Sequence, residues 1–88
     1  MRIEMPEQVF FSYLDYSYEH NSGRCIRPTF SDAVAAFFRG YGFDGTVEVV
    51  SIYRGWAEIE VTGDLPACFT TNAQAIGLHG TVFYRKVG

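Results

Sequence analysis

The chain has 88 residues, 48% of them hydrophobic and 17% aromatic, with a formal net charge of −3. This length and composition indicate one globular domain, and the acidic balance argues against nonspecific binding to duplex DNA or anionic membrane, which requires a basic footprint. No signal-peptide run and no apolar stretch of about 20 residues is present, and Cys25 and Cys68 are too few for a disulfide framework. We therefore expect a single cytoplasmic domain over 1–88 with reduced thiols.

The segment 9–18 carries two competing patterns. Nearly all of its residues favour β-structure. A helix that Pro6 would open also fits, with a stripe at Phe10, Tyr13, Leu14, Ser17 and Tyr18. Because aromatic residues are enriched in strands, we prefer a strand to a helix here. A turn at 21–23 and a short edge strand at 25–27 are expected to follow.

The clearest helical signal covers Ser31–Arg39. Ser31 is a suitable N-cap, and Asp32 in the first turn complements the helix dipole. Two glycines that follow the segment are expected to stop the helix. Its buried stripe should consist of Val34, Phe37 and Phe38.

A β-hairpin is predicted from strands at 46–53 and 56–62. Arg54 and Gly55 suit a two-residue loop, which pairs Tyr53 with Trp56, Ile52 with Ala57 and Val50 with Ile59. Alternation then assigns one face to the core, with Val50, Ile52, Ala57, Ile59 and Val61. The opposite face carries Val47, Val49, Ser51, Tyr53, Trp56, Glu58 and Glu60, and so combines aromatic, aliphatic and acidic side chains.

Two further elements complete the expected order. Residues 72–76 suggest a short helix and 81–87 a final strand. The order strand, helix, strand, strand, helix, strand is that of the split βαβ arrangement. We predict an α+β fold, a ferredoxin-like βαββαβ two-layer sandwich with an antiparallel sheet and two helices on one face.

Two segments resemble the signatures of RNA-recognition-motif domains. The third-strand octamer of that family is similar to 54–61, where Arg54, Gly55, Trp56 and Ala57 fit, while Glu58 stands at an aromatic position. The first-strand hexamer of the family is similar to 9–14. The resemblance implies a single-stranded RNA-binding domain in which Phe10 and Trp56 stack on bases.

Signals for catalysis or metal binding are weak. His20 and His79 are the only histidines, and nothing in their spacing brings them together for acid–base chemistry. The two histidines and the two cysteines lack the short spacings of a zinc site. We therefore expect no enzymatic activity, no cofactor and no metal.

The hairpin is the best candidate for a binding surface. Tyr, Arg and Trp supply most interface hot spots, and Tyr53, Arg54 and Trp56 lie together at its tip. Glu48, Glu58 and Glu60 would steer the surface towards a basic protein, which we expect to be one that handles nucleic acid. Immunity proteins, antitoxins and anti-CRISPR inhibitors are similar in size and charge. The sequence thus favours a protein-binding inhibitor or regulator, with RNA binding through Phe10 and Trp56 or self-association into a homo-oligomer as alternatives.

Overall fold

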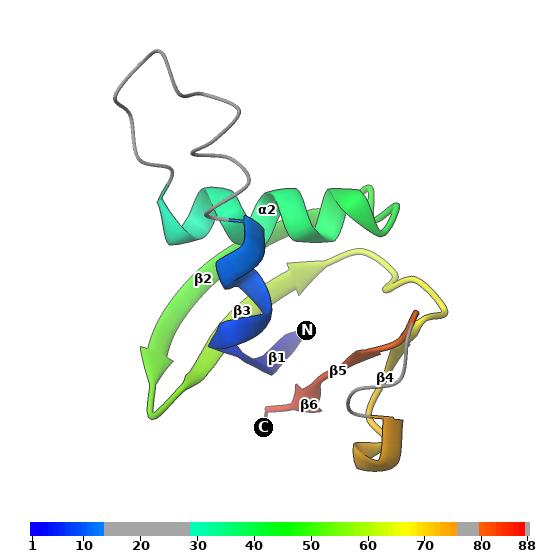
Figure 1. The fold of residues 1–88 in the computed structure, drawn as a ribbon. Coiled ribbons are helices and arrows are strands. Elements are labelled where there is room, and N and C mark those ends of the chain that lie inside the picture. Colours follow the sequence, from blue (N-terminus) through cyan, green and yellow to red (C-terminus); the bar gives the residue numbers. More distant parts are fainter. Residues whose placement is uncertain (14–28, 76–79, 88) are drawn as a thin grey trace.

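The computed structural model describes residues 1–13, 29–75 and 80–87. Four strands form an antiparallel sheet in the order β2-β3-β1-β6, and a helix crosses one face of it (Figure 1). The strands of this sheet are β1 (Arg2–Pro6), β2 (Thr46–Tyr53), β3 (Trp56–Thr62) and β6 (Arg85–Lys86). The helix is α2 (Phe30–Gly40). The predicted α+β class and antiparallel four-stranded sheet are confirmed.

The first strand lies earlier in the chain than predicted. It is β1, and the 3₁₀ helix η1 (Glu7–Phe10) follows it directly, with helical residues at 11–13. The predicted strand at 9–18 is therefore wrong over 9–13. Pro6 ends the strand and has a φ of −57°, which leads the backbone into η1. Residues 14–18, and the predicted turn and edge strand at 21–27, lie outside the described residues.

Helix α2 begins with a capping box formed by Thr29 and Asp32. The Asp32 amide donates to Thr29 Oγ1 at 3.1 Å, and the Thr29 amide donates to Asp32 Oδ2 at 3.2 Å. These two bonds satisfy amides that the first turn would otherwise leave unpaired. The cap is therefore Thr29 and not the predicted Ser31. The predicted buried stripe is confirmed, and Ala33 is buried beside it.

The hairpin of β2 and β3 has the predicted bounds and turn. Arg54 and Gly55 both have positive φ angles, 52° and 82°, as a two-residue turn of type I′ requires. Tyr53 faces Trp56 and Ile52 faces Ala57, as predicted. The third predicted pair is wrong, because Ile59 faces Val49 instead of Val50.

A bulge at Val50 explains this difference. The register shifts between Val49 and Ser51, so the extra residue reverses the side-chain alternation along β2. Val47 and Val49 consequently pack against the core, whereas the prediction placed them on the other face. Val50, the bulge residue, is 43% exposed instead of buried. Ile52 keeps its predicted position opposite Ala57, but it is 45% exposed and not part of the core. On β3, which has no bulge, the predicted core residues Ala57, Ile59 and Val61 are buried.

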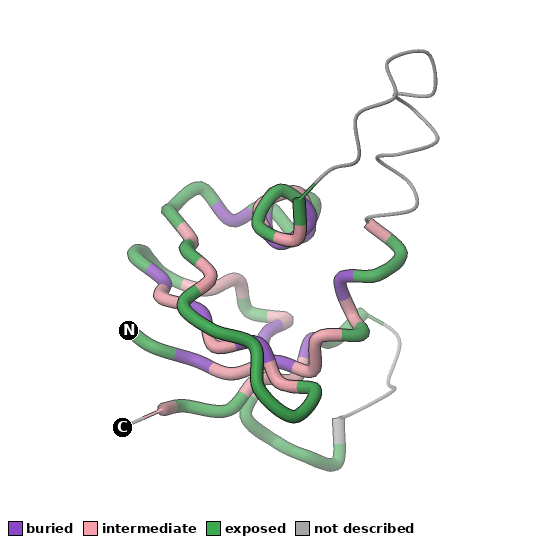
Figure 2. Tube along the Cα trace, turned by 90° about the vertical axis from the view of Figure 1, so that its left-hand side faces the viewer, coloured by how far each residue is buried: buried purple, intermediate pink, exposed green. Residues whose placement is uncertain are grey.

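The core has an aliphatic side and an aromatic side. The sheet contributes Ile3, Met5, Ala57, Ile59 and Val61, all at most 1% exposed. Against them packs the aromatic cluster, which we define as Phe10, Phe37, Phe38, Phe43 and Phe69. The Phe37 ring is central, because its centroid lies 5.0 Å from that of Phe10 and 4.9 Å from that of Tyr41. Buried residues are concentrated where α2 and the sheet face each other (Figure 2).

The C-terminal region is less regular than predicted. The expected helix at 72–76 is a single 3₁₀ turn, η2 (Ala73–Ala75), with residue 76 outside the described part. The expected strand at 81–87 is divided into β5 (Val82–Phe83) and β6. Strand β5 pairs in parallel with β4 (Phe69–Thr70), while β6 pairs with β1. Among the described segments, no helix has the length and apolar character to cross a membrane.

Candidate interaction surface

The sheet has an open face on the side opposite α2. Because Ile3, Met5, Ala57 and Ile59 point into the core, the residues that alternate with them point the other way. The register sets Arg2 beside Glu60 and Glu4 between Glu58 and Arg85. We use "open face" for this side of the sheet, which carries Arg2, Glu4, Glu48, Ser51, Tyr53, Trp56, Glu58, Glu60 and Arg85.

Trp56 is covered by an arginine from the far end of the chain. The Arg85 guanidinium carbon lies 3.4 Å from the centroid of the Trp56 ring, and Arg85 Nη2 donates to Glu4 Oε1 at 3.1 Å. This is cation–π geometry with a carboxylate holding the cation in place. Trp56 itself is half-buried. One face of the predicted anchor is therefore occupied within the chain.

The open face is less acidic than its sequence suggests. Arg2 Nε lies 3.2 Å from Glu60 Oε2, so Glu60, like Glu4, has an arginine partner. Glu58 Oε2 accepts a hydrogen bond from Ser51 Oγ at 3.2 Å. In the described part of the chain neither Glu48 nor Glu58 makes an ion pair. These two carboxylates are the ones available to a cationic partner.

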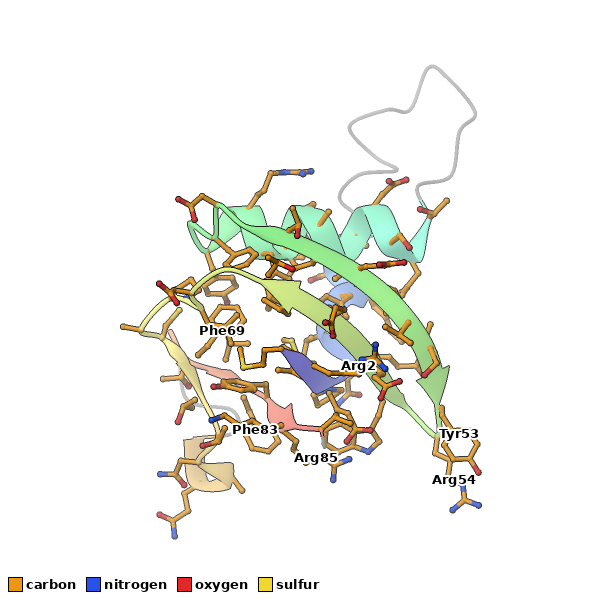
Figure 3. All side chains as sticks on the ribbon, turned by 180° about the vertical axis from the view of Figure 1, so that it is seen from behind. Arg2, Tyr53, Arg54, Phe69, Phe83 and Arg85 are labelled. Atoms are coloured by element: carbon orange, nitrogen blue, oxygen red, sulfur yellow. The ribbon has the colours of Figure 1, made fainter. Side chains whose placement is uncertain are left out.

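The hairpin tip presents the most exposed aromatic ring of the described chain. Tyr53 is 68% exposed, and the Arg54 guanidinium carbon lies 5.2 Å from its ring centroid. Figure 3 shows both side chains at the end of the molecule away from α2. Arg54 is also the only described non-glycine residue with a positive φ. A side chain in this left-handed region costs on the order of 1 kcal/mol, and asparagine or glycine is preferred there.

Five of the six predicted contact residues lie together. Tyr53, Arg54, Trp56, Glu58 and Glu60 share one hairpin. The sixth, Phe10, is fully buried, with the rings of Phe30 and Phe37 at 5.5 and 5.0 Å. Its predicted role in binding is wrong, because it follows β1 in η1 and points into the core.

Three open-face residues were not identified from the sequence. Arg2 and Glu4 alternate with Ile3 and Met5, which is a strand signal, although a short one. Arg85 reaches Trp56 only because β6 pairs with β1, and β1 pairs with β3. No local pattern at 81–87 indicates that contact.

A pocket of about 350 Å³ lies between η1, α2 and β5. Aromatic rings of Tyr13, Phe37, Tyr41 and Phe83 line it, together with a few neutral polar groups. No group of three potential metal ligands is found among the residues that the structure places. Cys68 is half-buried with a free thiol, whereas His20, Cys25 and His79 lie outside the described residues.

Comparisons with protein-family models, with curated proteins and with solved structures found no match to this chain.

Proposed function

We propose that this protein is a non-enzymatic binding module that contacts a protein partner through the tip and open face of the β2–β3 hairpin. The observation that carries the proposal is the pair Tyr53 and Arg54. Tyr53 is largely exposed, and Arg54 keeps an unfavourable backbone conformation although asparagine would fit the turn better. Strained backbone conformations occur preferentially at functional sites, and tyrosine and arginine are frequent hot-spot residues of interfaces.

The proposed partner is a basic protein that handles nucleic acid, which this chain would inhibit or regulate in the manner of anti-CRISPR, immunity or antitoxin proteins. Support comes from the net charge of −3 and from Glu48 and Glu58, whose carboxylates have no cationic partner in the described structure. Complementary charges increase association rates and disfavour wrong partners. Trp56 contributes less to binding than Tyr53 and Arg54, since Arg85 already covers one face of its ring.

For the fold we propose the ferredoxin-like arrangement. It is supported by the chain order of the main-sheet strands with α2 between β1 and β2, and by the central position of β1 and β3. The same placement favours single-stranded RNA binding as the second candidate. Trp56 lies on the open face of a central strand, against the guanidinium group of Arg85.

The main proposal can be tested by assaying purified nucleases and RNA-guided effector complexes with and without the protein. We expect inhibition of a basic member of the panel, weakened at least about tenfold by Tyr53→Ala or Arg54→Ala, as for removal of a hot spot. Arg39→Ala is the matched control, because Arg39 is exposed at the end of α2. Inhibition that both hairpin variants retain would contradict the proposed surface.

A titration with random single-stranded RNA at low salt distinguishes the two candidates. Trp56 is the only tryptophan, so its fluorescence reports directly on the open face. No change is expected for a protein-binding module. Saturable quenching that salt abolishes would instead support the RNA-binding function.

A further inference from the structure

The outer edge of β2 has no strand partner in the described structure. Strand β2 ends the sheet order and has eight residues, whereas β6 at the other edge has two. Figure 1 shows β2 along one side of the sheet. A free edge presents backbone donors and acceptors to another strand, and proteins commonly protect it with proline, lysine or a covering element. Between Thr46 and Tyr53 there is neither proline nor lysine.

The side chains along this edge are apolar and exposed. Val50 and Ile52 are 43% and 45% exposed, and Glu48 is the only charged residue of the strand. Val50 is the bulge residue, and Ile52 lies opposite Ala57 near the hairpin tip. The edge thus combines free backbone groups with hydrophobic side chains, which are the two requirements for strand addition.

We propose that β2 pairs antiparallel with β2 of a second copy of this chain, about a two-fold axis between Val49 and Val50. The pairs would be Thr46 with Tyr53, Val47 with Ile52, Glu48 with Ser51, and Val49 with Val50. Before the bulge, Thr46 and Glu48 are on the open face, and after it Ser51 and Tyr53 are. In this register every open-face residue meets an open-face residue, and the valines meet valine or isoleucine.

Charge also selects this register. Each Glu48 would lie opposite Ser51, whose hydroxyl is a donor, so no two carboxylates are directly opposed. A register with Glu48 on the axis would set two like charges face to face, which is destabilising. The strand is therefore complementary to itself, as a two-fold interface requires, and this favours a second copy over an unrelated strand.

The dimer would have one continuous eight-stranded sheet. Its contact uses the backbone edge of β2 and leaves Arg54, Trp56 and Glu58 outside the pairing. Tyr53 and Glu48 would lie beside Thr46 and Ser51 of the second copy with their side chains still on the open face, so the dimer does not depend on the proposed function. A single strand edge from each copy is a small interface. The association is therefore expected to depend on concentration.

Sedimentation velocity over a concentration series tests the association. We expect the wild-type mass to rise towards twice the monomer mass, and Ile52→Lys to remain monomeric at the same concentrations. Phe11→Lys is the matched control, because Phe11 is similarly exposed, at 46%, but is not part of β2. A wild-type protein that stays monomeric throughout, or an Ile52→Lys protein that dimerises equally, would overturn the proposal.

Cysteine cross-linking tests the register. In Glu48→Cys/Ser51→Cys, each new thiol would face its counterpart on the other copy, so mild oxidation should produce a covalent dimer. The two positions are about 10 Å apart along one strand, too far for a bond within the chain. Each single variant serves as a control that also accounts for Cys25 and Cys68. Equal cross-linking of Glu48→Cys alone would exclude this register.

Discussion

The β2–β3 hairpin and the aromatic cluster beneath α2 use similar side chains in opposite ways. In the cluster, phenylalanine rings meet each other edge to face, and Phe10 and Phe38 are at most 1% exposed. At the hairpin tip, Tyr53 and Ile52 face solvent. The comparison shows that aromatic content alone does not indicate a binding surface in this chain. The position of each ring relative to α2 decides whether it stabilises the fold or is available for contact.

The largest expected effect is in the cluster. Phe37→Ala removes the ring at its centre and should lower the free energy of unfolding by about 3–5 kcal/mol, from lost burial and from the cavity left behind. Urea unfolding followed by Trp56 fluorescence measures the loss. Tyr53→Ala is the contrasting variant, with an expected change within about 0.5 kcal/mol because the side chain is exposed. If Phe37→Ala and Tyr53→Ala lowered the free energy of unfolding by similar amounts, the distinction between the cluster and the hairpin tip would be wrong.

Trp56 is half-buried, and so lies between the buried cluster and the exposed hairpin tip. Its contact with Arg85 can be tested by substitution. Arg85→Ala should lower the free energy of unfolding by about 0.5–1 kcal/mol through the lost contact with the ring. Combined with Trp56→Phe in a double-mutant cycle, it should show a coupling free energy of similar size. Independent effects of the two substitutions would mean that the guanidinium does not rest on Trp56 in solution.

The remaining expected effect is a modest gain in stability. Arg54→Asn places the preferred residue in the left-handed turn position and should raise the free energy of unfolding by up to about 1 kcal/mol. The same substitution should weaken partner binding, because it removes the guanidinium beside Tyr53. Thermal unfolding and the inhibition assay measure the two changes separately. A gain in stability with full inhibition would mean that Arg54 is not part of the contact.

Local sequence signals predicted the regular elements of this fold. The turn formed by Arg54 and Gly55 and the alternation on β3 determined the hairpin bounds, and the glycines after Arg39 marked the end of α2. The bulge at Val50 was not predictable, because it depends on how β2 packs against both α2 and β3. Strand β1 was missed because it offers only two inward residues, Ile3 and Met5, beside the much stronger aromatic signal of 9–18.

Only those residues of the candidate site that lie close together in the chain were predicted from the sequence. Five hairpin residues were identified because a two-residue turn brings them together whatever the rest of the fold does. Phe10 was misplaced along with the first strand. The contact of Arg85 with Trp56 requires the pairing of β6 with β1, which is a property of the whole sheet.

The pairing of β1 has a consequence for how the chain folds during synthesis. Strand β1 lies between β3 and β6, yet both partners follow it in the chain, β3 from Trp56 and β6 from Arg85. Contacts between residues so distant in sequence slow folding, because a long loop must close before they form. At translation rates of about 5–20 residues per second, Ile3 and Met5 wait several seconds for a partner. Helix α2 can form during that time, and because β6 is synthesised last, its pairing with β1 is the expected late step of folding.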